Sequence, residues 1–218
     1  MDELDHSAME LLHHAHRLGF TVLAITLHGH ALLKPEIFAE AERLGLLLIP
    51  GAELSIEGVD VIILNLTEEE SLSLKTFDSL KALRQLRGDS LLVFAPHPFF
   101  VVGGSMGRLL EEHLGCFDAI EYCHFHTSFI NLNDPAVKIA VAHGVSLLAT
   151  SDTHLLDYFG DHYSLIQAPA KPNAEEIFAA IRLGRIQRIS PPRPLWKFAY
   201  YIWFLMIMHP VKKLLARA

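Results

Sequence analysis

The sequence predicts an α/β protein built from repeated strand–helix units. Short apolar runs alternate with amphipathic segments of helical length, and glycines follow several of those segments where helix ends are expected. The 218 residues are 51% hydrophobic and 20% charged, which is enough apolar material for a substantial core and excludes a disordered, collagen-like or coiled-coil chain. A barrel and an open doubly wound sheet both fit this rhythm.

Seven candidate strands are mostly continuous apolar runs, which is typical of parallel strands buried on both faces. They are Thr21–Thr26, Leu46–Ile49, Val59–Leu66, Leu91–Ala95, Phe117–Tyr122, Ser146–Thr150 and Tyr163–Gln167. Five segments between them have helical periodicity: Ser7–Leu18, Pro35–Leu44, Leu74–Leu86, Pro135–His143 and Asn173–Leu183. Helix ends are indicated by Gly19, Gly45, Gly144 and Gly184.

The charge, cysteine content and histidine content of the sequence indicate which functions to expect. The 18 Lys and Arg residues against 25 Asp and Glu residues give a formal net charge of −7, which argues against binding nucleic acid through a basic surface. Two cysteines are too few for a disulfide framework, and the N-terminus shows no signal-peptide pattern, so we expect a cytoplasmic protein. The 14 histidines favour a metal site or an acid–base site.

Histidine or carboxylate residues follow five of the seven candidate strands. They are His28, Glu53, His97, the pair His124 and His126, and the pair Asp152 and His154. In both architectures the carboxyl ends of the strands gather at one side of the sheet, so these side chains are expected to converge. Imidazole nitrogens together with carboxylate oxygens suit divalent transition metals, which activate water and clamp phosphoryl oxygens. Each residue alone is more often a surface or capping residue, and the repetition at equivalent places favours a shared site.

Four segments of the sequence resemble successive motifs of the polymerase and histidinol phosphatase (PHP) domain family. They are LAITLHGH (23–30), LIPGAELS (48–55), APHP (95–98) and ATSDTH (149–154), and the segment from Gly160 to Ile186 is similar to one that often closes such proteins. The resemblance implies a distorted (β/α)7 TIM-like barrel, two or three divalent ions (manganese, zinc or iron) and phosphoesterase activity. It implies metal ligands at His28, Glu53, His97, Asp152 and His154, with His124 or His126 in the place of a further histidine.

The sequence departs from the family pattern at three places. The strand with an H-x-H motif that opens the family is absent, because the chain begins just before its first predicted helix. Leu27 stands where the family has an aspartate, and Asp60 lies near where many members carry a histidine. Either the strand is encoded upstream of the recorded start, or the chain is a shortened relative with a depleted metal site.

The C-terminal part differs in composition from the rest. We expect a barrel domain over residues 1–190 and a helical apolar and basic segment over residues 191–218, joined by the stiff sequence Pro191 to Pro194. The apolar run from Phe198 to Met208 is 11 residues long, whereas a spanning helix needs about 20. Residues 195–215 are therefore expected to lie at the inner membrane surface, in an oligomer contact or against the barrel.

These observations favour a metal-dependent phosphoesterase acting on a nucleotide, an oligonucleotide or a small phosphorylated metabolite. His97, His124 and His126 are the candidates for protonating the leaving oxygen. Two alternatives remain: a non-catalytic PHP-like binding module with a depleted metal site, and a different metal hydrolase, such as one that cleaves amides, on a similar barrel.

Overall fold

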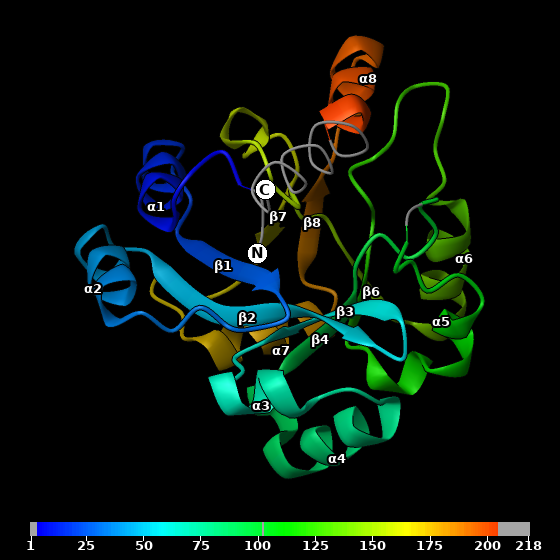
Figure 1. The fold of residues 1–218 in the computed structure, drawn as a ribbon, viewed down its shortest axis with the longest axis horizontal. Coiled ribbons are helices and arrows are strands. Elements are labelled where there is room, and N and C mark those ends of the chain that lie inside the picture. The colour runs from blue at the N-terminus through cyan, green and yellow to red at the C-terminus, as the bar shows by residue number, and fades with distance from the viewer. Residues whose placement is uncertain (1–3, 102, 205–218) are drawn as a thin grey trace, which may run out of the picture.

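A six-stranded, mostly parallel sheet forms the centre of the computed structural model, which describes residues 4–101 and 103–204 (Figure 1). Its strands lie side by side in chain order: β1 (Val22–His28), β2 (Leu47–Ile56), β3 (Val59–Leu64), β4 (Leu92–Ala95), β5 (Ala119–Glu121) and β6 (Ser146–Leu148). The pairs β1–β2, β4–β5 and β5–β6 are parallel. The α/β class expected from the sequence is confirmed.

Strand β3 runs antiparallel to both β2 and β4, which the apolar pattern did not predict. The reversal is made at Glu57 and Gly58, which have φ angles of 52° and 86°. Two consecutive left-handed residues form the tight turn that suits the twist of a β-hairpin. As a result β2 continues to Ile56, and the prediction that this strand ends at Ile49 is wrong.

Eight α-helices are found within the described residues. They are α1 (Ala8–Arg17), α2 (Pro35–Arg43), α3 (Glu68–Ser73), α4 (Phe77–Arg87), α5 (Leu109–Glu112), α6 (Asp134–His143), α7 (Ala174–Arg182) and α8 (Leu195–Trp203).

 Three 3-10 turns accompany the helices, at Gly88–Ser90, Leu114–Cys116 and Leu156–Tyr158.

Helix starts follow the local sequence. Ser7 accepts a hydrogen bond from the backbone N–H of Glu10 while the Glu10 carboxylate accepts one from the Ser7 N–H, so a capping box begins α1. Thr67 with Glu70 and Asn173 with Glu176 begin α3 and α7 in the same way. The predicted helices are all present with slightly different ends, whereas α3 and α5 were not predicted.

The central strands are buried on both faces of the sheet. In β3, Val61 and Ile63 belong to one apolar cluster and Ile62 and Leu64 to another. This arrangement explains the continuous apolar run in the sequence, because neighbouring residues of a strand point to opposite faces. An ion-pair network adds to the core beside β5, where the Asp118 carboxylate accepts hydrogen bonds from Arg84, Arg182 and the Val93 backbone N–H.

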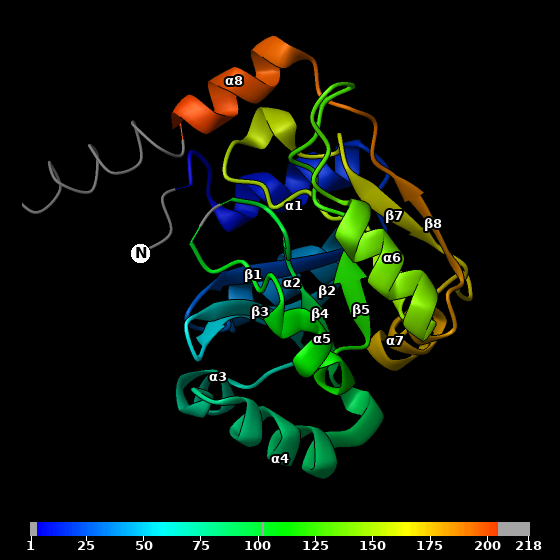
Figure 2. The same cartoon turned by 90° about the vertical axis from the view of Figure 1, so that its right-hand side faces the viewer.

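A separate antiparallel ribbon, β7 (Tyr163–Ile166) and β8 (Ile186–Ile189), lies beside β6 (Figure 2). Strand β8 was not predicted from the sequence. Strand β1 stands at one end of the strand order and β6 at the other, so the described residues form no closed barrel. The seven-stranded closure remains a prediction, and no strand preceding β1 is found in the described part of the chain.

Helix α8 follows the proline-rich sequence at 191–194 and packs over the loops that follow β5 and β6 (Figures 1 and 2). Its Tyr201 is fully buried among Phe125 and Tyr158. Residues 205–208 of the predicted apolar run lie outside the described residues. Among the described residues, no helix is long and apolar enough to cross a membrane. The division at residue 190 stays a prediction.

Candidate metal centre

Strands β1 and β2 bring His28 and Glu53 together. The two residues are partners in the parallel register, and His28 Nε2 lies 3.9 Å from Glu53 Oε1. Glu53 therefore lies within β2 and not after its end, because the strand continues to Ile56, just before the hairpin turn. Its side chain is buried, whereas half of the His28 ring is exposed. A buried carboxylate needs a cation or several donors to offset its desolvation.

His97 follows β4 and reaches the same carboxylate. Its Nε2 lies 3.2 Å from Glu53 Oε1, and its backbone N–H donates to the fully buried carboxylate of Glu121. The φ angle of His97 is 28°, a strained value for a residue with a side chain. The Thr150 hydroxyl donates to the other Glu121 oxygen at 2.5 Å. Glu121 thus holds the turn that aims His97 at Glu53.

Asp60 completes a compact group with Glu53 and His97. One possible ligand atom from each residue lies within 4.8 Å of the others. Asp60 comes from β3, and its backbone N–H donates to the Gly104 carbonyl at 2.7 Å. The sequence pointed to Asp60 only as a departure from the family pattern, and it was not among the predicted ligands. The β2–β3 hairpin places Asp60 beside Glu53, and the apolar pattern of the sequence did not predict that hairpin.

Asp152 and His154 follow β6 at the same side of the sheet. His154 Nδ1 lies 3.7 Å from Asp152 Oδ1, and the His154 ring centroid lies 6.2 Å from that of His28. The φ angle of Asp152 is 41°, another left-handed value next to the cluster. The hydroxyl of Tyr201 on α8 donates to the Asp152 carbonyl at 2.8 Å. Backbone strain at both His97 and Asp152 is typical of residues held for function.

The carboxylates of the cluster repel one another. Burial and the charge of Glu53 raise the pKa of Asp60, and burial raises the pKa of Glu121 to about 7. Burial also opposes ionisation of Asp152, but the surrounding histidines outweigh it and lower the pKa of that carboxyl. Burial lowers the pKa of His97, yet its hydrogen bond to Glu53 and the nearby carboxylates raise it to about 9. The site therefore attracts positive charge.

This donor set fits a divalent cation. Carboxylate oxygens and imidazole nitrogens are the ligands that manganese, zinc and iron accept. His97 Nδ1 and both ring nitrogens of His124 are buried and have no hydrogen-bond partner within the described residues. These nitrogens are therefore possible metal ligands that no other described residue occupies. Of the predicted ligands, Glu53 and His97 lie in one compact group, His28 adjoins Glu53, and Asp152 and His154 form a neighbouring pair.

The two further histidines lie in different surroundings. His124 is completely buried, and burial lowers the pKa of its ring well below the usual value although Asp152 acts in the opposite direction. His126 Nε2 lies 3.2 Å from the Ser190 hydroxyl, which also lies 2.8 Å from His162 Nδ1. The charge of Asp152 therefore acts on His124, whereas His126 contacts Ser190, the residue just after β8. Their roles stay predictions.

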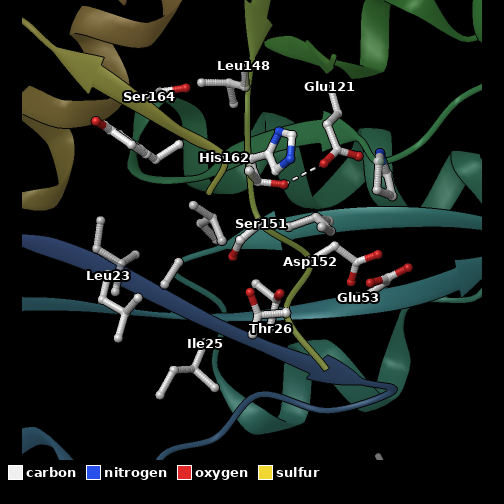
Figure 3. A pocket seen from close by; sticks show the side chains of 18 of the residues that line it. Leu23, Ile25, Thr26, Glu53, Glu121, Leu148, Ser151, Asp152, His162 and Ser164 are labelled. Atoms are coloured by element: carbon white, nitrogen blue, oxygen red, sulfur yellow. Dashed lines mark hydrogen bonds between the residues drawn. The ribbon is translucent and has the colours of Figure 1, made fainter. Parts of the chain in front are cut away.

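A cavity of about 280 Å³ opens beside the cluster, between β1 and the segment from β6 to β7. Figure 3 shows Glu53, Glu121 and Asp152 at one part of its wall, with Leu23 and Ile25 of β1 at another. His28 and His154 also line it. These polar residues, which lie on or just after β1, β2, β5 and β6, border a space that apolar side chains also line.

Three solved structures share this architecture. The chain superposes with a TM-score of 0.63 at 16% identity on a two-domain protein from Bacteroides vulgatus containing a predicted PHP-like metal-dependent phosphoesterase, covering 86% of this chain and 61% of that one. It superposes with PsfC from Pseudomonas syringae at a TM-score of 0.59 and 20% identity, covering 90% and 88% of the two chains. The lesion-specific endonuclease PfuEndoQ from Pyrococcus furiosus gives a TM-score of 0.55 and 16% identity, covering 82% and 52%.

These comparisons establish the fold. The chain spans about six tenths of the length of the Bacteroides protein and about half of the endonuclease. No protein-family model matches the sequence, and no curated protein is significantly similar to it in sequence. The chain shares its α/β fold with these proteins, one of which contains a predicted PHP-like phosphoesterase, and this confirms at the level of the fold the resemblance seen in its motifs.

Proposed function

We propose that this chain is a metal-dependent phosphoesterase. The observation that carries the proposal is the compact group of Glu53, Asp60 and His97, of which Glu53 lines the cavity. The group lies within a fold shared with a predicted metal-dependent phosphoesterase and an endonuclease. Nearby carboxylates without enough cationic partners are costly to bury, and a bound divalent cation would offset that cost.

Glu53, Asp60 and His97 would hold a cation, and Asp152, His154 and His28 would complete the donor set around the same space. When bound, divalent cations lower the pKa of water and neutralise the charge of a phosphoryl group. Manganese, zinc and iron are the candidates, because mixed histidine and carboxylate sites accept these ions.

The other residues position the donors. Glu121 accepts from the His97 backbone N–H and from Thr150, which fixes the direction of the imidazole. His28 has its ring half exposed at the cavity and is placed to contact an incoming phosphoester. His97, His124 and His126 remain the proposed proton donors, and only His97 belongs to the compact group. The substrate class that we propose is a nucleotide, an oligonucleotide or a small phosphorylated metabolite.

The test is hydrolysis of p-nitrophenyl phosphate and bis-p-nitrophenyl phosphate, a monoester and a diester, by the full chain with added manganese, zinc or iron(II). Asp152→Asn removes a charge at a position where asparagine also tolerates the left-handed backbone. We expect it to lower kcat by about a hundredfold or more. His143→Gln, an exposed histidine at the end of α6, is the matched control and should retain wild-type activity.

Equal hydrolysis in the Asp152→Asn variant or in excess chelator would overturn the proposal. Metal binding without hydrolysis of either ester would favour the non-catalytic binding module. Cleavage of amides but not of phosphoesters would favour the alternative metal hydrolase.

A further inference from the structure

Helix α8 exposes a stripe of aromatic side chains. Trp196, Tyr200 and Trp203 are 69%, 47% and 43% exposed, and their spacing of four and three residues places them on one face of the helix. The opposite face is buried, with Tyr201 completely covered. These two tryptophans are the only ones in the 218-residue sequence. Both are therefore presented to the outside by the same short helix.

Further apolar side chains lie at the same end of the molecule. Leu195 is 54% exposed at the start of α8, and the loop before α6 exposes Phe129 and Ile130 by 84% and 46%. The backbone N–H of Arg193, just before α8, donates to the His126 carbonyl at the start of that loop. Figures 1 and 2 both show the loop and α8 at one end of the fold. Exposed apolar groups gathered in this way mark an interaction surface.

Charge is distributed unevenly along the sequence, and the C-terminal part that includes α8 carries only basic charged residues. Residues 190–218 contain five of the 18 Lys and Arg residues and none of the 25 Asp and Glu residues. Arg193 and Lys197 both pair with Asp161. The other three, Lys212, Lys213 and Arg217, follow the apolar sequence that continues from α8. An acidic protein thus has a basic, aromatic-rich C-terminal sequence.

We propose that the exposed aromatic face of α8 docks on the surface of an anionic phospholipid bilayer. Tryptophan and tyrosine favour the boundary between lipid and water, and nearby lysine and arginine are attracted by anionic headgroups. A second copy of the chain fits this face less well, because pairing would bring two basic segments together. The helix lies on the surface in this arrangement and does not span it.

Docking of α8 also holds the candidate metal centre near the lipid. The Tyr201 hydroxyl donates to the Asp152 carbonyl, and the His154 backbone N–H donates to the same hydroxyl at 3.4 Å. The helix that carries the aromatic stripe is thereby bonded to the segment that carries two proposed metal ligands. Tyr201 thus connects the helix proposed to dock on lipid with the segment that borders the cavity.

Intrinsic fluorescence tests the proposal directly, because all tryptophan emission of the chain comes from α8. The full chain is titrated with vesicles of phosphatidylcholine containing phosphatidylglycerol and, separately, with vesicles of phosphatidylcholine alone. We expect the emission to shift to shorter wavelength with the anionic vesicles, to shift less with neutral vesicles, and to lose the difference at high salt. Unchanged emission with both kinds of vesicle would overturn the proposal.

Sedimentation with the same vesicles shows which residues are needed for binding. The double variant Trp196→Ser and Trp203→Ser should bind anionic vesicles about tenfold more weakly or worse, since two interfacial anchors are lost. Leu86→Ser, which replaces an apolar residue that is 81% exposed on α4, is the matched control and should bind as the wild type does. Equal binding by the double variant, or a stable dimer in gel filtration whose tryptophan emission does not respond to vesicles, would contradict lipid docking.

Discussion

Replacing Gly104 by alanine tests whether Asp60 belongs to the metal centre. A β-carbon built on Gly104 would lie 1.7 Å from Asp60 Oδ2 and 2.4 Å from Asp60 Cγ, far closer than atoms can approach. The φ angle of Gly104 is +91°, which alanine adopts only with strain. The Asp60 carboxylate must therefore leave its present position beside Glu53 and His97 in the variant.

The two effects of Gly104→Ala can be separated in magnitude. The backbone strain alone should lower the free energy of unfolding by about 1–2 kcal/mol. Displacing the carboxylate partly relieves its repulsion with Glu53, so the metal-free protein should lose little beyond that strain. Metal affinity should fall by about tenfold to a hundredfold, the usual cost of disturbing the surroundings of a metal ligand.

Two neighbouring glycines provide matched controls. Gly107 has a φ angle of +55° and nothing within 4 Å of an added β-carbon, so Gly107→Ala tests strain without the clash. Gly103 has neither property, and Gly103→Ala should resemble the wild type. Isothermal titration with manganese or zinc measures affinity, and urea unfolding measures stability. Wild-type metal affinity in Gly104→Ala would refute the assignment of Asp60.

Three further predictions concern stability and protonation. Asp118→Ala should lower the free energy of unfolding by about 3 kcal/mol, because it leaves the two arginines that donate to that carboxylate without their partner. Urea unfolding measures this change, and a loss below about 1 kcal/mol would contradict the prediction. Burial and the charge of a nearby arginine lower the pKa of His162 to about 3. Between pH 6.5 and 3 this histidine is therefore protonated in the unfolded chain but not in the folded one. The free energy of unfolding should fall by up to about 1.4 kcal/mol per pH unit as the pH drops through that range. Unfolding of His162→Gln should depend less on pH in this range, and an equal dependence would argue against the assignment. In the metal-free protein the pKa of His97 is about 9, so its ring is protonated near pH 7.5 and metal uptake should release about one proton. Calorimetry in buffers of different ionisation enthalpy measures the number of protons released. No release would contradict the pairing of His97 with Glu53.

The sequence predicted the convergence of His28, His97 and Asp152 because parallel strands bring their carboxyl ends to one side of a sheet. Continuous apolar runs identified the buried strands, and glycines and capping residues identified most helices. These signals are local, and the residues that carry them are close together in the chain. The structure therefore follows the sequence pattern most closely for β1, β4 and the segment after β6.

The rest of the site depends on pairing that the apolar pattern does not encode. The turn at Glu57 and Gly58 extends β2 and reverses β3, which places Glu53 inside a strand. It pairs Asp60 with Ser55, so that the Asp60 carboxylate lies close to that of Glu53. A two-residue turn between apolar runs is the signal that would have predicted this hairpin. The close approach of Gly104 to Asp60 joins residues 44 positions apart and leaves no local mark in the sequence.

The most direct test of the account is the metal content of the full chain, purified without chelator and measured by elemental mass spectrometry. The account predicts at least one manganese, zinc or iron ion per chain, and a clear loss of that ion in Glu53→Gln, with His143→Gln retaining it. A wild-type chain that binds none of these ions even after incubation with each, or a Glu53→Gln variant that retains the full amount, would contradict the proposed metal centre.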